Sequence, residues 1–483
     1  MAEGDSAGRC SSDAQNPESP GLRPSRAGRP TWLLRLLPAA LLTAAIALYN
    51  QFPLTYPDTG NYLVDAFAIA HGRAPWFFYR PVVYGAFLVP FASAQTIWLI
   101  PVAQGLLVAF VVDLSLRVAE VRISTRGFLA LFAGLTAFTS LPWFSGQIMP
   151  DIFTSFVILL GFVSVWGGRQ TAFERGAAGA LLAFALGSHL SHLPLYGILA
   201  IAMLAGRLLV DGSSRSWRRF APLALRAIAP PVVAAGFLIG SNYFVYREPV
   251  LSRSSSLFAL AHLVGDGLTQ RYLDRACPTL QYQLCTERAS LRPDVDWFLW
   301  HSDGPWKRHE AELQRGDSTF LREASAIVAG TWRQEWPAAV RASLRNTIVQ
   351  LGTIGHHPAE LAFSPSVEEA LERLDPGTLR AYKDSRQVRG SLPVETVSRV
   401  QYVVVGLSLL VLLGCLPALR GPQLAPLRSL IATVCMGVVF NALVVASLAM
   451  VHPRYQSRVV WLIPLMAAVA ALRIVRPRAQ RSP

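Results

Sequence analysis

Long runs without charge recur along this chain and alternate with short clusters of arginine. A helix of about 20 apolar residues crosses the roughly 30 Å hydrocarbon core of a bilayer. The pattern therefore predicts an all-α polytopic membrane protein with about ten transmembrane helices. We expect these helices near residues 32–50, 94–116, 127–142, 151–167, 176–206 (two short spans that meet near His189), 226–246, 403–419, 429–451 and 459–473.

The arginine clusters predict the orientation of the chain, because positive charge concentrates in cytoplasmic loops. The clusters lie within 117–126, 169–175, 207–226, 420–428 and 473–481. With the predicted spans, all of them fall on the side of the N-terminal tail, so both termini are expected in the cytoplasm. The segments expected to face outward are 51–93, 143–150, 247–402 and 452–458.

The same pattern divides the chain into parts. In chain order we expect a disordered cytoplasmic tail (1–31), an N-terminal transmembrane region (32–246) that includes the first outer loop (51–93), an outer loop domain (247–402), C-terminal transmembrane helices (403–475) and a cytoplasmic tail (476–483). The first tail is rich in Ser, Pro and Gly. No cleavage site precedes the first span, which should remain as an anchor. Within the outer domain, apolar positions over 317–350 have helical spacing.

Cysteines and composition narrow the class of protein. Cys277 and Cys285 lie eight positions apart in the outer domain, where an oxidising compartment favours a disulfide; two free thiols are the alternative. No CxxC or paired Cys/His spacing indicates a zinc site. The net charge of +14 lies mainly in loops of one side, which indicates membrane orientation rather than nucleic-acid binding. No glycine-rich phosphate loop is present, which disfavours a nucleotide-driven pump.

Two carboxylates stand out in the first outer loop, in "YPDTGNYLVDAF". Helical spacing places Asp58, Tyr62 and Asp65 on one face. A carboxylate at the membrane surface could act as general base toward an acceptor hydroxyl, or hold an amine or a metal ion. The alternative is that Asp58, which follows Pro57, caps a short helix while Asp65 is solvated.

Other polar residues are expected on the same side of the membrane. Asp151 follows Pro150 at the start of a span. A helix N-terminus favours negative charge, so this position is sufficient to explain the carboxylate without a functional role. His189 and His192 lie at the outer end of two spans, where they could bind metal, share a proton or make ordinary interfacial hydrogen bonds.

Arginine and aromatic side chains complete the predicted pocket. Arg454 and Arg458 share a helical face and could clamp a phosphate, as could Arg80. The alternative is that they contact lipid headgroups or anchor the span. Aromatic faces suit sugar rings. The predicted pocket is lined by Tyr62, Asp65, His189, His192 and Tyr455.

The order of "YRPVVYGAFLVPF", "MPDIFTSFVILLGF" and "PRYQSRVVWLIPL" after a first-loop Asp resembles the GT-C superfamily of integral membrane glycosyltransferases. The branch it resembles contains protein mannosyltransferases and the bacterial aminoarabinose transferase of lipid A. The resemblance covers the membrane part, about half of the chain, and not 247–402. It implies inverting transfer of a sugar from a polyprenyl-phosphate donor at the periplasmic or luminal face, to an acceptor that it does not identify. Nearly all basic residues are arginine rather than lysine, a skew typical of GC-rich genomes, so we expect the bacterial inner membrane and an acceptor of the cell envelope.

The resemblance also implies roles for single residues. Asp58 matches the catalytic Asp of the first loop, and Arg454 matches the late basic residue that meets the donor phosphate. Asp151 matches the acidic residue that opens a later span and is predicted as the second catalytic residue. Many relatives carry a paired acid, DE or DxD, in the first loop, whereas Thr59 follows Asp58 here. This departure leaves the need for a divalent metal ion open.

Three other functions compete with this interpretation. A polysaccharide polymerase or O-antigen ligase would also have many spans, a large outer loop and arginines for lipid pyrophosphate. A lipid or solute transporter would place more polar residues within its spans. If the protein were a receptor or scaffold, substitutions at Asp58 should leave its function unchanged.

Overall fold

The computed structural model describes residues 33–75, 78–93, 96–168, 170–210 and 216–475. These residues form helices and one isolated β-bridge, between Leu54 and Gln147. Six of the described helical segments are long and apolar enough to cross a membrane: Leu99–Val118, His192–Leu209, Phe220–Tyr246, Val394–Leu419, Pro422–Leu448 and Pro453–Ile474. The chain is therefore an all-helical, multi-pass membrane protein. The predicted total of about ten spans stays a prediction.

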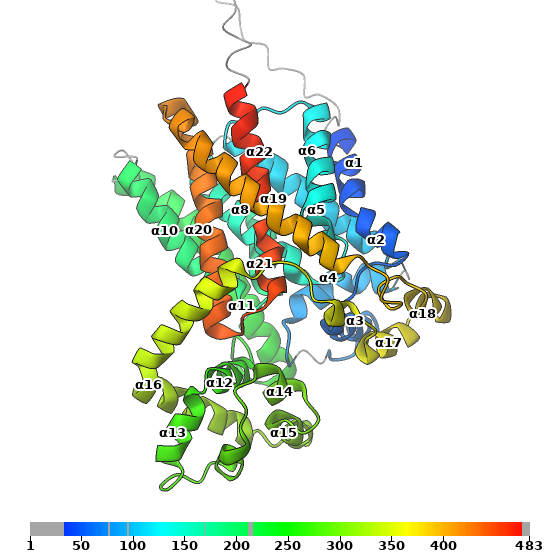
Figure 1. The fold of residues 1–483 in the computed structure, drawn as a ribbon, viewed down its shortest axis with the longest axis vertical. Helices are drawn as coiled ribbons and strands as arrows, with labels where there is room; N and C mark the ends of the chain where they lie inside the picture. Colours follow the sequence, from blue (N-terminus) through cyan, green and yellow to red (C-terminus); the bar gives the residue numbers. More distant parts are fainter. Residues whose placement is uncertain (1–32, 76–77, 94–95, 169, 211–215, 476–483) are drawn as a thin grey trace, which may run out of the picture.

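The apolar helices form one bundle (Figure 1). In chain order its main members are α1 (Leu33–Thr43), α5 (Leu99–Val118), α6 (Thr125–Phe138), α8 (Phe153–Trp166), α9 (Ala172–Ser188), α10 (His192–Val210), α11 (Trp217–Tyr246), α19 (Val394–Cys415), α20 (Ala425–Leu448) and α22 (Leu462–Val475). α9 ends and α10 begins on either side of His189, as the pattern predicts. The start of α1 and the end of α22 lie at the same end of the bundle.

Helix α8 lies at the centre of the bundle, and almost all of its side chains are buried. It packs against α5, α9, α10, α11 and α20. A Cβ atom added to Gly437 of α20 would lie 2.7 Å from Ile158 of α8, so only glycine allows these two helices to approach so closely. This packing fixes the first turn of α8, which carries part of the candidate site.

The segment 51–93, which is predicted to be the first outer loop, contains two helices, α3 (Pro57–Ala70) and α4 (Val82–Ser93), packed against each other. The helical spacing from Asp58 to Asp65 corresponds to α3. Thr59 anchors the start of α3, because its hydroxyl accepts a hydrogen bond from Tyr56 N at 2.9 Å and donates one to Ile148 O at 2.9 Å. A Cβ atom on Gly60 would lie 2.2 Å from the carbonyl oxygen of Ser366 in α17 (Pro365–Glu372), so α17 lies directly against α3.

The segment 247–402, predicted to face outward and called the outer segment or outer domain below, folds against two separate cores. The helices α12 (Ser255–Gly265), α13 (Leu268–Ala276), α14 (Val295–Trp300) and α15 (Pro305–Gln314) and the first half of α16 (Thr319–Gly352) enclose a core of their own around Phe298, Trp306 and Phe320. These helices lie at the end of the molecule opposite the start of α1 (Figure 1). Helices α17 and α18 (Pro376–Lys383) join the core of the bundle instead.

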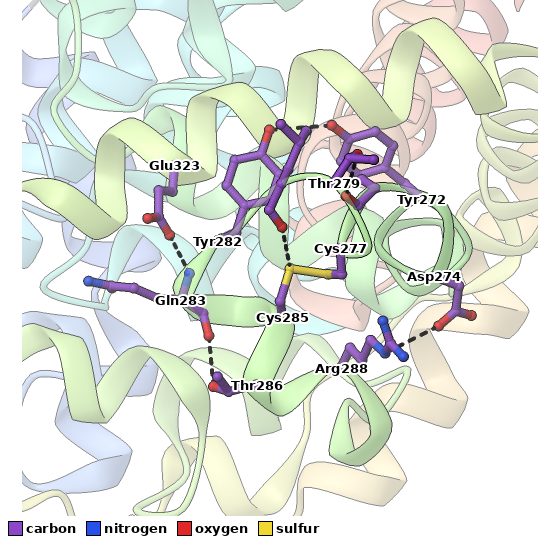
Figure 2. Close-up of a disulfide and its surroundings, with 12 residues drawn as sticks. Tyr272, Asp274, Cys277, Thr279, Tyr282, Gln283, Cys285, Thr286, Arg288 and Glu323 are labelled. Atoms are coloured by element: carbon purple, nitrogen blue, oxygen red, sulfur yellow. Dashed lines mark hydrogen bonds and ion pairs between the residues drawn. A yellow bond between two sulfur atoms is a disulfide. The ribbon is translucent and has the colours of Figure 1, made fainter.

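Cys277 and Cys285 form a disulfide with a sulfur–sulfur distance of 2.06 Å (Figure 2). The bridge closes a short loop that follows α13. Gln283 N, within that loop, donates a hydrogen bond to Glu323 of α16 at 2.8 Å. The disulfide therefore holds the loop that ties α13 to α16.

Replacing both bridged cysteines by serine should loosen this corner of the outer domain. Opening a loop of this size removes about 2–3 kcal/mol of stability in the chain-entropy account. Hydrogen–deuterium exchange should speed up over 268–290 while the bundle helices keep their protection. Cys435→Ser, which removes a cysteine outside any disulfide, is the matched control. Unchanged exchange in the double variant would show that packing alone holds the loop.

Candidate active site

Ionisable residues gather where several helices begin, at the end of the bundle nearer the outer domain. Asp58 lies in the first turn of α3, Asp151 in the short 3-10 helix η1 (Pro150–Ile152) before α8, and Arg454 and Arg458 in α21 (Pro453–Val460). Each of these three helices starts with proline, which suits the first helical position because its missing N–H would be unpaired there. The two aspartates also lie where helix dipoles favour negative charge.

The charged side chains alternate in sign along one row. Arg80 Nη2 lies 2.7 Å from Asp58 Oδ1, and Arg454 Nη1 lies 3.8 Å from Asp58 Oδ2. Arg454 Nε and Nη2 donate to the two oxygens of Asp151, both at 3.1 Å, and Arg458 Nη1 lies 3.4 Å from Asp151 Oδ1. Three guanidiniums and two carboxylates leave this row, the arginine–aspartate row, with one positive charge in excess.

Exposure changes steadily from one end of the row to the other. The side chains of Asp151 and Arg458 are completely buried, and that of Arg454 is 9% exposed. Those of Asp58 and Arg80 are 15% and 18% exposed. The end formed by Asp58 and Arg80 is therefore the part of the row that solvent or a substrate can reach.

Aromatic rings cover the guanidiniums. The Arg454 guanidinium lies 4.0 Å from the Tyr56 ring centre, the Arg458 guanidinium 5.2 Å from that of Tyr455, and the Arg80 guanidinium 5.6 Å from that of Phe258. Such contacts favour the cation over a ring face. Burial raises the pKa of the Tyr56 hydroxyl, against the opposing charge of Arg454, so the phenol stays neutral. Tyr56 can then both donate and accept a hydrogen bond beside the row.

Polar residues hydrogen-bond to Arg458 and so hold the buried end of the arginine–aspartate row in place. Arg458 Nη2 donates to Ser191 Oγ at 3.1 Å and to Asn441 Oδ1 at 3.0 Å, while Asn441 Nδ2 donates to Tyr455 O at 2.7 Å. Our sequence prediction did not include Ser191, Asn441 or Tyr56. A signal for Asn441 was present, because an amide inside the apolar run of α20 needs a polar partner within the bilayer.

The end of α16 holds the start of α21. The Gln350 amide donates to His452 O at 2.9 Å and accepts from His452 N at 2.8 Å, and His452 Nε2 pairs with Glu360. His452 Nδ1 in turn accepts from Arg454 N at 3.2 Å. The outer segment is thus hydrogen-bonded to the backbone that carries Arg454. Sequence reasoning missed Gln350 and Glu360, which lie about a hundred positions before α21.

Most of the predicted pocket residues lie inside the protein rather than on an open surface. Tyr62, Asp65 and His192 are buried. His192 bridges helices, with Nε2 2.7 Å from Thr154 Oγ1 and Nδ1 2.6 Å from Ala185 O. His189 is half-buried, and its Nδ1 accepts from Ser191 N at 3.2 Å. The ring of Tyr455 contacts the row directly, with its centre 5.7 Å from the Arg454 guanidinium and 5.2 Å from that of Arg458.

The donor set does not fit a divalent metal ion. Within the described ranges, no three His, Cys, Asp or Glu residues lie close enough together to hold one. Asp58 is flanked by Arg80 and Arg454, and the positive charges of these two side chains repel a metal cation. Magnesium and calcium need several oxygen ligands, which the row does not offer.

Comparison with known proteins found one solved structure to report. No protein-family profile and no curated protein matches the chain. The chain is similar to the crystal structure of ArnT from Cupriavidus metallidurans bound to undecaprenyl phosphate, at 15% identity and a TM-score of 0.31. The match covers 87% of this chain and 77% of the ArnT chain. A similarity of this extent assigns no function to the chain.

Proposed function

We propose that this protein is a membrane glycosyltransferase that moves a sugar from a polyprenyl-phosphate donor to an envelope acceptor at the periplasmic face of a bacterial inner membrane. The observation that carries the proposal is the arginine–aspartate row, with its one excess positive charge and its accessible end at Asp58 and Arg80. The placement of this row among apolar helices suits a substrate whose lipid part stays in the bilayer.

The excess positive charge suits the leaving group. A polyprenyl phosphate departs as an anion, and guanidinium groups bind phosphate oxygens through paired N–H donors. Arg80 and Arg454 flank Asp58 from two sides. Fixed donors of this kind stabilise charge that develops in the transition state.

Asp58 is the proposed general base. Its carboxylate takes the proton of the acceptor hydroxyl, whose oxygen attacks the anomeric carbon from the side opposite the phosphate. The bond from that carbon to the phosphate oxygen breaks, the phosphate keeps the electron pair, and the sugar is transferred with inversion. Asp151 is completely sealed from solvent, so its proposed role is to orient Arg454 and Arg458 rather than to accept a proton.

The proposed orientation follows from the position of the arginine clusters. The start of α1 and the end of α22 lie at the end of the bundle away from the outer domain (Figure 1). The connectors near that end carry the clusters that indicate the cytoplasm. The row and the disulfide then lie on the periplasmic side, where disulfides persist.

The test is donor turnover by the purified full-length protein in liposomes loaded with a panel of polyprenyl-phosphate sugars. We expect one donor to be consumed once its acceptor is supplied in an envelope extract, with release of polyprenyl monophosphate detected by mass spectrometry. If these donors stay intact while a polyprenyl-pyrophosphate-linked glycan, added in parallel, is consumed with release of polyprenyl pyrophosphate, the protein would instead be a polymerase or ligase. A folded protein that consumes no donor would contradict the proposal.

A further inference from the structure

A cavity of about 260 Å³ lies between α8, α9 and α11, away from the arginine–aspartate row. It is near the end of the bundle where α9 and α11 begin and α8 ends. Its volume far exceeds that needed for one water molecule and approaches the range of small-ligand pockets. The proposed sugar transfer makes no use of it.

Polar and apolar residues are separated along the cavity. α9 and α11 start at this end, and their first lining residues are Arg175 and Arg226. Farther along the same helices the lining residues are apolar, as far as Ala183 and Val233. Seven or eight helical residues correspond to about 11 Å of depth. The cavity therefore has a cationic end and a hydrocarbon wall that leads into the bilayer.

Small side chains create the space, and its mouth faces the lipid. A Cβ atom added to Gly179 would meet no atom within 4 Å, so the groove beside this residue is open. Val233 lies within a candidate membrane span and is 61% exposed. A cavity that opens sideways at this depth faces lipid chains rather than water, so a hydrocarbon chain is the occupant that its surroundings supply.

The two arginines at the cationic end are engaged by backbone carbonyl groups. Arg226 Nη1 donates to Gly167 O at 3.0 Å, and Arg175 donates to Gln170 O. Among the described residues neither forms an ion pair with a carboxylate, although Glu174, next to Arg175, pairs with Arg117. Two guanidiniums without an acidic partner at a membrane boundary suit an anionic phosphate.

We propose that this cavity binds an anionic phospholipid of the adjacent leaflet. One acyl chain lies in the groove beside Gly179 and Ala183, and the headgroup phosphate lies at Arg175 and Arg226. The lipid fills the space between α9 and α11 and thereby supports the packing of α11 on the bundle. The inference does not depend on the transferase function.

The test is a titration of the delipidated full-length protein with phosphatidylglycerol and with phosphatidylcholine, followed by native mass spectrometry. We expect tighter binding of phosphatidylglycerol, weakened about fivefold for each arginine removed in Arg175→Gln and Arg226→Gln. Gly179→Leu, which fills open space, should weaken the binding of both lipids without lowering the melting temperature.

Controls separate this site from general surface charge. Arg218 is exposed near the start of α11 and does not line the cavity, so Arg218→Gln should leave the affinity unchanged. An equal loss in Arg218→Gln, or equal phosphatidylglycerol binding by wild type and the Arg175→Gln, Arg226→Gln double variant, would overturn the proposal. Binding of inorganic phosphate as tightly as phosphatidylglycerol would also overturn it, because the acyl chain would then contribute nothing.

Discussion

Asp58→Asn is expected to lower the rate of donor turnover by about a thousandfold, within the range that a positioned general base contributes. The amide keeps the size of the side chain and can still accept a hydrogen bond from Arg80, but it cannot take a proton from the acceptor. Arg80 is 18% exposed and Arg454 keeps its pair with Asp151, so the loss of the Asp58 charge leaves no completely buried cation unpaired. The melting temperature should therefore stay close to that of wild type. The measurement is single-turnover loss of donor in liposomes.

The Michaelis constant distinguishes catalysis from positioning. Removing one carboxylate raises the net charge of the row, so the donor KM should stay the same or fall while kcat drops. A raised KM with little change in kcat would show that Asp58 only orients Arg80 and Arg454. Asp384→Asn is the matched control, because it removes an exposed carboxylate of the outer segment that pairs with Arg389 at 2.8 Å. That variant should keep wild-type turnover.

The hydrophobic pattern was sufficient for the fold class and for the break between α9 and α10. The charge-free runs are long, and within a bilayer each run must form its own backbone hydrogen bonds as a helix, whatever its neighbours are. α4 was missed because it is only 12 residues long, contains Pro90 and lies within a loop expected to face outward. A short apolar helix buried against other protein segments has the same composition as a buried strand or a fragment of a transmembrane helix, so periodicity cannot distinguish them.

The site could be predicted only in part, because its contacts join residues far apart in the chain. Helix starts and loop positions placed Asp58, Asp151 and Arg454 on one side of the membrane. Their order in the row depends on packing between α3, α8 and α21, and the pair of Asp151 with Arg454 spans 303 positions. Periodicity describes each helix separately, so it cannot show that Asp151 is sealed while Asp58 is reachable.

Asp151→Asn is expected to destabilise the protein strongly, in contrast to Asp58→Asn. The substitution leaves Arg454 and Arg458 close together, at 9% and 0% exposure, without the carboxylate between them. Removing one partner of a buried ion pair costs about 3–5 kcal/mol. The melting temperature of the purified protein should fall, and donor binding should weaken because Arg454 loses its bidentate partner.

A second variant tests whether unbalanced charge is the cause. Adding Arg458→Met to Asp151→Asn removes one charge of each sign, so part of the lost stability should return even though Ser191 and Asn441 lose a donor. Asp113→Asn is the comparison, since Asp113 lies between Arg35 at 2.8 Å and Arg117 at 2.9 Å, and Arg117 is 47% exposed. Water can solvate the charge left there, so its loss of stability should be smaller. If Asp113→Asn and Asp151→Asn lowered the stability equally, and the double variant recovered none of it, the burial of Asp151 would not determine the cost of removing its charge.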